Sequence, residues 1–327
     1  MSTINWGIIG CGDVTEVKSG PAFNKVPASN LRAVMRRDAI LAEDYAKRHN
    51  VGQWFSNADD MMDNAGLDAV YIATPPAFHL QYAISALNKG LNVYVEKPVT
   101  LNASEAQQMA EAVKNSGAKL TVAHYRRGLP LFLKIKQLID DGIVGEIRTV
   151  QIKLWQSRKP ALVANTVVNW RVQPELSGGG YFHDLAPHQL DLMLFFFGEP
   201  EKYQGYSLNQ ANLSPADDHV CGQIVFKSDI VVNGSWCFNV ADSQQNDLCE
   251  IVGTEGVIKF AFFGDYVSWE NTNEKHTETF VHPQHIEQPM IAKVVRYFNG
   301  EQGNPCAIEE AVTLMKIMDA FITKPGN

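Results

Sequence analysis

Short apolar runs alternate with amphipathic segments over the first part of the chain. The apolar runs lie at 4–10, 31–35, 67–76, 91–98 and 119–123. Segments with helical spacing lie between them, at 41–49, 78–90 and 102–117. Continuously apolar strands that alternate with helices form a parallel sheet covered on both faces. We therefore predict a doubly wound α/β domain over residues 1–124.

The pattern changes after residue 125. Apolar and polar residues alternate at 146–155, 219–227, 230–238, 247–253 and 256–263. Such alternation is typical of antiparallel strands with one buried face. Helical spacing returns at 309–321. We predict an α+β domain with a large, mostly antiparallel sheet over 125–305, and a C-terminal helix within 306–327 that packs back on the first domain.

The net charge limits the classes of binding partner, and the cysteines indicate the redox compartment. The 28 basic and 36 acidic residues give a net charge of −8, and there is no basic run. This argues against nucleic acid or an anionic membrane as partner and favours a small molecule. The five cysteines are widely spaced without a C-x-x-C, which indicates reduced thiols in the cytoplasm. The N-terminus lacks a signal-peptide pattern, and the densest apolar run, 192–198, is too short to span a bilayer.

A glycine loop follows the first predicted strand. In "WGIIGCGDVT", Gly10, Gly12 and Thr15 occupy the G-x-G-x-x-G/A positions, with threonine at the third. Gly10 allows a tight turn, and Gly12 lets the backbone approach a pyrophosphate at a helix N-terminus. We predict a dinucleotide site that includes Gly10, Gly12, Asp13 and Val14. The alternative is a purely structural turn, and we expect Thr15 to loosen helix–strand packing slightly.

The end of the second predicted strand bears on cofactor choice. An NAD site places an acid there to bind the ribose 2′-hydroxyl. This chain has Arg36 with Arg37 beside it, and Asp38 comes two residues later. An arginine pair suits a 2′-phosphate, so we predict NADP as the preferred cofactor and NAD as the alternative. In the other interpretation, both arginines are solvated charges of a loop and bind no phosphate.

The stretch "NVYVEKPVT" ends a strand on Glu96, Lys97 and Pro98. The proline restrains Lys97 to an extended conformation. Ligands of open α/β sheets bind beyond the carboxyl ends of the strands, where a lysine can stabilise an alkoxide. The alternative is a surface lysine paired with Glu96. We assign cofactor binding to Thr74, Pro75, Pro76, His79, Glu96 and Lys97, with the segment 73–76 beside the nicotinamide.

The segment 177–200 holds three glycines and a second set of candidates. Asp184, His188 and Asp191 share one face if the segment is helical. Because Pro187 is tolerated only in a first turn, we expect the helix to begin near 184–186. His188 is the candidate proton-transfer group, and Asp184 orients it or holds the substrate hydroxyl. The alternative is that Asp184 only caps the helix and His188 is a solvated residue on its surface.

We predict no metal in this segment. His183, Asp184 and His188 do not form a complete coordination set, and no cysteine lies near them.

Taken together, these motifs resemble the glucose–fructose oxidoreductase/inositol dehydrogenase/MocA-like (Gfo/Idh/MocA) family, over essentially the whole chain. The resemblance implies a Rossmann domain and a second domain whose sheet mediates homodimers or homotetramers. It implies NAD(P)-dependent hydride transfer between nicotinamide and a carbinol or carbonyl of a sugar, polyol or related molecule. The family's lysine, aspartate and histidine map to Lys97, Asp184 and His188. The segments that enter its substrate cleft map to Tyr125, Arg126, Trp170 and Arg171.

Three departures from the family pattern are Thr15, Arg36 in place of the acid, and Pro187 where glycine or serine is usual. Two further functions stay open. One is a non-catalytic NADP-binding sensor. The other is a reductase like the dihydrodiol dehydrogenases, some of which carry tyrosine at the histidine position. A methyl-transfer enzyme that uses the glycine loop for adenosylmethionine is disfavoured by Arg36.

Overall fold

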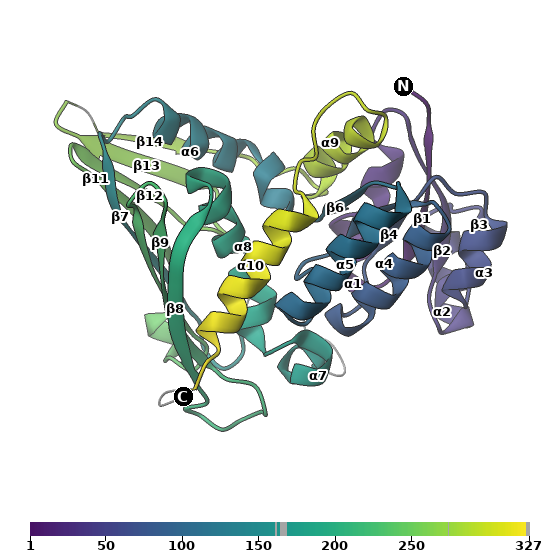
Figure 1. The fold of residues 1–327 in the computed structure, drawn as a ribbon, viewed down its shortest axis with the longest axis horizontal. Helices are drawn as coiled ribbons and strands as arrows, with labels where there is room; N and C mark the ends of the chain where they lie inside the picture. The colour runs from purple at the N-terminus through teal and green to yellow at the C-terminus, as the bar shows by residue number, and fades with distance from the viewer. Residues whose placement is uncertain (161, 164–168, 274, 325–327) are drawn as a thin grey trace. The chain divides into compact units, whose positions relative to one another are not determined.

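The computed structural model describes residues 1–160, 162–163, 169–273 and 275–324. The chain forms two compact units (Figure 1). The first unit contains residues 1–128 and 283–313, and the second contains residues 129–282 and 314 onward. The last three residues of the predicted C-terminal segment, 325–327, lie outside the described residues.

A six-stranded parallel sheet forms the centre of the first unit, in the order β3-β2-β1-β4-β5-β6. Its strands are β1 Ile4–Ile9, β2 Ser29–Met35, β3 Gln53–Phe55, β4 Ala69–Ile72, β5 Asn92–Val95 and β6 Leu120–Val122. Residues that the sequence shows as continuous apolar runs are buried on both faces, and Tyr71 stacks on Tyr94 with ring centroids 5.1 Å apart. The predicted doubly wound fold is confirmed.

Helices alternate with these strands. They are α1 Asp13–Val17, α2 Ala39–Arg48, α3 Ala58–Asn64, α4 His79–Asn88 and α5 Ala103–Ser116, with 3-10 turns η1 Gly20–Asn24, η2 Pro76–Phe78 and η3 Tyr125–Gly128. The side chains of Asp38, Asn57 and Asn102 cap the N-termini of α2, α3 and α5. Gly117 ends α5 in a left-handed conformation, as the sequence predicts. The elements β3 and α3 are not among those predicted from the pattern.

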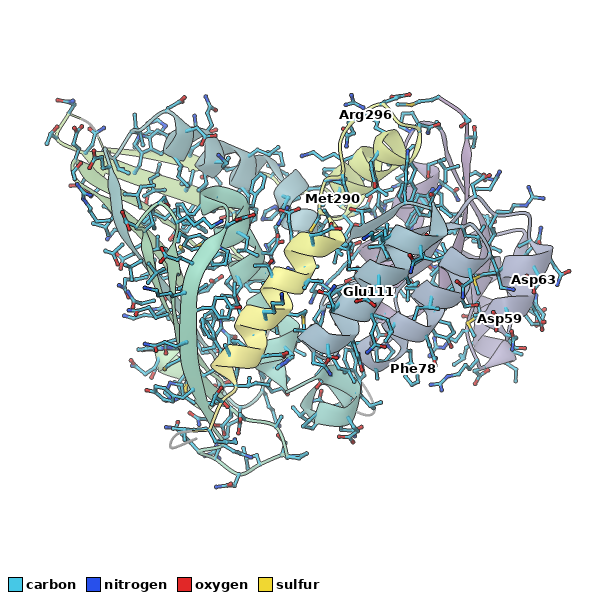
Figure 2. The ribbon with its side chains drawn as sticks, viewed as in Figure 1. Asp59, Asp63, Phe78, Glu111, Met290 and Arg296 are labelled. Carbon is cyan, nitrogen blue, oxygen red and sulfur yellow. The ribbon has the colours of Figure 1, made fainter. Side chains whose placement is uncertain are left out.

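The chain returns to the first unit at residue 283. Helix α9, Gln288–Phe298, carries Met290 and Arg296, which are labelled in Figure 2. A Cβ at Gly128 would lie 3.1 Å from the backbone nitrogen of Met290, a tight contact that glycine avoids. Lys119 also donates hydrogen bonds to the carbonyls of Tyr297 and Phe298, at 2.9 and 3.0 Å. The end of α9 is thereby attached to the start of β6.

The second unit contains an eight-stranded sheet in the order β14-β13-β12-β11-β7-β10-β9-β8. Its strands are β7 Ile147–Trp155, β8 Pro200–Leu208, β9 His219–Phe226, β10 Val231–Cys237, β11 Asn246–Gly253, β12 Gly256–Phe260, β13 Tyr266–Asn271 and β14 Lys275–Thr279. Among the described strands of this second sheet, only the β10–β7 pair is parallel, and the other pairs are antiparallel. The predicted large, mostly antiparallel sheet is confirmed.

Helices α6 Pro130–Asp140 and α8 Tyr181–Phe197 lie against one face of this sheet (Figure 1). The unit also contains α7 Pro174–Ser177 and the turns η4 Trp170–Val172 and η5 Asp242–Gln244. Helix α10, Ile308–Phe321, has residues in both units. Alternate residues of β7, namely Val150, Ile152 and Leu154, are buried beneath the helices. None of the described helices is long and apolar enough to cross a membrane.

Helix α8 begins earlier than the sequence predicts. It starts at Tyr181, so Pro187 lies inside the helix and not in its first turn. An interior proline removes one helical hydrogen bond and costs about 3 kcal/mol. Thirteen side chains of α8 are buried, and burial of that extent outweighs the local cost. Asp184, His188 and Asp191 keep the predicted one-face spacing.

Candidate functional site

The glycine loop joins β1 to α1 at the carboxyl end of the parallel sheet. Gly10 has φ +94°, and a Cβ there would lie 2.7 Å from the Thr74 methyl group. The amides of Gly10 and Cys11 both donate to the Met35 carbonyl, at 2.9 and 3.1 Å. Only glycine fits this turn. Gly12 is extended and faces open space, since a Cβ there would be no closer than 3.9 Å to any neighbour.

Thr15 ties the loop together. Its hydroxyl accepts a hydrogen bond from the Gly12 amide at 2.9 Å and donates to the Gly12 carbonyl at 2.8 Å. The Thr15 side chain is fully buried. The glycine that allows close backbone packing here is Gly20, just after α1, and not residue 15. A Cβ at Gly20 would lie 2.3 Å from the Thr15 carbonyl oxygen. Threonine at the third position therefore stiffens the turn ahead of α1.

The arginine pair follows β2 directly. Arg36 donates from Nη1 to the Cys11 carbonyl at 3.3 Å, which places its guanidinium beside the glycine loop. Arg37 lies over the ring of Phe78, 5.1 Å from the centroid (Phe78 is labelled in Figure 2). Asp38 accepts hydrogen bonds from the amides of Ile40 and Leu41 at 3.0 and 3.1 Å. Asp38 is thus engaged as the cap of α2, and Arg36 is the first residue after β2.

Two loops at the ends of β4 and β5 are joined by His79. Its Nε2 lies 2.7 Å from the Thr74 carbonyl, and its Nδ1 lies 3.0 Å from the Pro98 carbonyl. Burial lowers the pKa of His79 to about 4, so the ring is neutral and donates to one carbonyl at a time. The Thr74 hydroxyl is buried and has no hydrogen-bond partner among the described residues. Pro75 and Pro76 continue this loop into η2.

The Glu96–Lys97–Pro98 turn follows β5. The Lys97–Pro98 peptide bond is cis. Glu96 is buried, accepts a hydrogen bond from the Tyr71 hydroxyl at 2.6 Å, and accepts another from the Lys97 amide at 3.2 Å. Burial raises the pKa of Glu96, while the nearby Lys97 charge opposes that rise. The alternative from the sequence was a surface lysine paired with Glu96, and the contact described here is between the Glu96 carboxylate and the Lys97 backbone amide.

Tyr125 and Arg126 open η3 and are both nearly fully buried. The Arg126 guanidinium lies over the Tyr125 ring, 5.3 Å from its centroid.

The second unit contains the sequence-predicted candidates Trp170, Arg171, Asp184 and His188. Arg171 lies over the Trp170 ring at 4.6 Å and donates from Nε to the Asp184 carboxylate at 3.0 Å. This pair is largely buried. His188 is buried too, with its ring edge-on to Phe263 at 5.7 Å. The pairing of Arg171 with Asp184 was not predicted, although both residues were.

His183 is a structural residue. It is fully buried, its ring is edge-on to Phe182, and a Cβ at Gly179 would lie 2.5 Å from its Cε1. Burial lowers the pKa of His183 to about 4. The glycine at 179 is therefore required by the close approach of this ring.

Sequence reasoning missed Tyr71, His285 and Glu287. Tyr71 lies within an apolar strand and carries no polar pattern around it. Glu287 is only 1% exposed, and its carboxylate lies 3.3 Å from the Tyr71 hydroxyl. A glutamate in a polar segment between a strand and a helix gives no local sign that it is buried.

A parallel sheet in this order with a glycine loop after its first strand is a dinucleotide-binding fold. Residues 4–124 match the family model described as the oxidoreductase family with an NAD-binding Rossmann fold, and residues 132–259 match the GFO/IDH/MocA C-terminal domain. The chain belongs to the Gfo/Idh/MocA oxidoreductase family, as the sequence motifs predicted. It is a nicotinamide-dependent oxidoreductase.

Relatives differ in how much of the chain they match. Oxidoreductase P35 of Formosa agariphila is 48% identical over 320 residues, 98% of either chain. The scyllo-inositol 2-dehydrogenase (NADP(+)) IolU of Bacillus subtilis is 33% identical over 210 residues, 63% of this chain and 62% of the other.

Solved structures share the fold. An oxidoreductase from Thermotoga maritima superposes with a TM-score of 0.87 at 22% identity, covering 99% of this chain and 97% of the other. A levoglucosan dehydrogenase in complex with NADH and levoglucosan superposes with a TM-score of 0.86 at 21% identity, covering 98% and 96%.

Proposed function

We propose that the protein is an NADP-preferring dehydrogenase or reductase that acts on a CH–OH group, or its carbonyl counterpart, of a sugar, polyol or related small molecule. One observation carries this proposal. The glycine loop, Arg36 and the Lys97 turn follow β1, β2 and β5, at the same edge of one parallel sheet. Cofactor and substrate of open α/β enzymes meet at that edge. The relatives named for inositol and levoglucosan support the substrate class.

The residues present fit a nicotinamide dinucleotide. Gly12 leaves open space beside the amides of Asp13 and Val14, which begin α1 and suit a pyrophosphate. Arg36 lies next to the loop, where a 2′-phosphate would be attached to the adenosine ribose. The buried Thr74 hydroxyl without a described partner suits a polar group of the nicotinamide half.

The chain's own groups divide the remaining work. The nicotinamide supplies or accepts the hydride when bound. The Lys97 ammonium binds the substrate oxygen and stabilises negative charge on it. His188 Nε2 or Nδ1 takes the hydroxyl proton in oxidation and returns it in reduction. Arg171 holds the Asp184 carboxylate in place, and Asp184 then orients the hydroxyl or the imidazole.

Substitution of the lysine tests this assignment. We expect Lys97→Ala to lower kcat by about 10²–10⁴ because the alkoxide loses its stabilising charge. The dissociation constant for NADPH should change little, since the glycine loop and Arg36 supply most of the cofactor contacts. Stopped-flow turnover and nicotinamide fluorescence measure the two quantities. Near-normal turnover in the folded variant contradicts the role of Lys97.

A substrate panel tests the function as a whole. Aldoses, inositols, ketoses, an anhydro sugar and a trans-dihydrodiol are each mixed with the protein and NADP⁺ or NADPH, and absorbance of the reduced nicotinamide is followed. Turnover of a sugar or polyol supports the proposal. Turnover of the dihydrodiol alone favours the reductase alternative. Tight cofactor binding with no turnover favours the sensor.

Three further expectations from the sequence are part of the proposal. The sequence assigns the dinucleotide-binding domain to 1–124, the substrate and oligomerisation domain to 125–305 and the C-terminal helix to 306–327. In the structure, residues 283–313 group with the first compact unit. The protein forms a homodimer or homotetramer through the second sheet. It acts in the cytoplasm on a small molecule.

A further inference from the structure

A buried acidic network lies beneath the Lys97 turn. It is built within the first unit where the chain returns at residue 283. The Glu287 amide donates to the Lys18 carbonyl at 3.2 Å. His285 donates from Nδ1 to the Val17 carbonyl at 2.6 Å, which leaves Nε2 to accept from the Lys25 ammonium at 2.7 Å. The returning segment is thus fastened to the end of α1.

The segment carries Glu287 to Tyr71. The Tyr71 hydroxyl lies 2.6 Å from a Glu96 oxygen and 3.3 Å from a Glu287 oxygen. A phenol has one hydrogen to donate, and the shorter distance shows that Glu96 receives it. Because Glu96 takes that hydrogen, the 3.3 Å contact becomes a full second hydrogen bond when the Glu287 carboxyl carries a proton and donates it to the Tyr71 oxygen.

Charge supports the same assignment. Burial raises the pKa of Glu287 well above its usual value, and the Glu96 charge raises it further. Lys18, Tyr71 and Lys97 act in the opposite direction. Glu96 is the better anion because it faces the Lys97 charge and accepts both the Tyr71 hydroxyl and the Lys97 amide.

Within the described parts of the chain, the remaining titratable group that acts on this pair is Tyr94, on β5. Burial raises its pKa well above the usual value, so it stays neutral. Tyr94 therefore adds no charge to the pair.

We propose that Glu287 is a positioning residue for Lys97. The protonated Glu287 carboxyl donates to Tyr71, Tyr71 donates to the Glu96 carboxylate, and Glu96 accepts from the Lys97 amide. This chain sets the backbone from which the lysine reaches the substrate. The expected effect of Glu287 on turnover rests on the proposed function. The proton on Glu287 can be measured without any substrate.

Infrared spectroscopy detects that proton directly. A difference spectrum between the wild type and Glu287→Gln at neutral pH should show the C=O stretch of a protonated carboxyl that the variant has lost. Glu301→Gln makes the same chemical change in the same returning segment, on a side chain that is 35% exposed. It should show no such loss. If the wild type lacks the band, or the Glu287→Gln variant keeps it, the proposed proton is not there.

Turnover tests the positioning role, using whichever substrate the panel identifies. Misplacement of a reacting group by about 1 Å costs about 10²-fold in rate, so we expect a kcat loss of about that size for Glu287→Ala. The NADPH dissociation constant should stay within about threefold, because no cofactor contact changes. Glu287→Gln should recover most of the loss, since its amide also donates to Tyr71. Equal losses in both variants contradict the role of the donated hydrogen.

The pH profile separates positioning from a general loss of structure. As the pH rises through the folded-state pKa of Glu287, the wild type gains a second buried charge and kcat should fall. Glu287→Gln should lack this alkaline decline, while any decline due to other groups persists in both. Identical profiles overturn the proposal. If the protein turns over no substrate in the panel, the proposed function is wrong. The infrared band still shows whether Glu287 carries a proton.

Discussion

Arg36 and Glu287 differ in what their neighbours along the chain reveal. Arg36 follows an apolar strand, so its place at the sheet edge can be predicted from the local pattern, and β2 does end at Met35. Glu287 meets a hydroxyl 216 residues away, across a fold that no local pattern specifies. The Arg171–Asp184 pair lies between these two cases in how far the sequence predicts it. Both residues were predicted for the site, but the three glycines between them hide how the chain turns back.

Replacement of the strand-end arginine tests cofactor preference. In Arg36→Asp, a carboxylate replaces the guanidinium and repels a 2′-phosphate. We expect NADPH to bind about 10–100-fold more weakly, a loss of about 1.4–2.8 kcal/mol, and NADH to bind equally well or better. Titrations of nicotinamide fluorescence measure both constants. Arg148→Asp, on a well-exposed arginine of β7, makes the same charge change as a control. Unaltered binding of both cofactors by Arg36→Asp would leave the preference without support.

Elements that depend on local pattern were predicted well, and those that depend on tertiary packing were not. Helix α5 has a polar cap and a glycine end, and its predicted limits agree with the structure. Strand β3 has three residues, too few to show a period. The start of α8 was wrong because the cost of Pro187 was weighed locally, whereas the burial of nearly the whole helix decides the outcome.

Two glycines in β8 and β9 show packing that the alternating pattern does not disclose. Gly205 and Gly222 face each other across the two strands. The Phe321 ring at the end of α10 lies over them, and it is fully buried. A Cβ at Gly222 would lie 2.2–2.4 Å from that ring. The missing side chains make the space that the phenylalanine fills.

Gly222→Ala should therefore destabilise the protein by about 1–3 kcal/mol through overpacking. Phe321→Ala should cost about 3–5 kcal/mol through the cavity it leaves. The double variant should lose less than the sum, because the added methyl group enters the emptied space. Urea unfolding measures all three. Gly52→Ala, where a Cβ meets nothing within 4 Å, is the control. Additive losses in the double variant would show that Gly222 and Phe321 are not coupled.

At the scale of the whole molecule, hydrophobic periodicity predicts two sheets. It does not predict which later segments of the chain belong to the same unit as each sheet. Residues 283–313 belong to the first unit, and their sequence gives no sign of it. Within the second unit, strand alternation does predict a face that points away from the helices. Among the described residues, no helix of that unit covers this face (Figure 1).

That uncovered face carries a row of β-branched side chains across five adjacent strands. Their register places them side by side: Val225, Val231, Thr149, Val252 and Val257. All five are partly exposed. A second row beside it is polar and includes the Gln223–Asn233 hydrogen bond at 2.8 Å and the Glu250–Lys259 ion pair at 2.7 Å. An apolar row flanked by polar groups is a surface that a second copy of the sheet can cover.

Val231→Lys tests the proposed oligomer at the middle of this row. A twofold interface places the substitution in both copies, so an unpaired ammonium would be buried twice and the dimer should dissociate. Sedimentation velocity should show an oligomer for the wild type and a smaller species for the variant, with the far-UV circular dichroism spectrum retained. Gln107→Lys adds the same charge to an exposed position of α5 and should leave the oligomer intact. A monomeric wild type, or a Val231→Lys protein of unchanged mass, would show that the row does not join subunits.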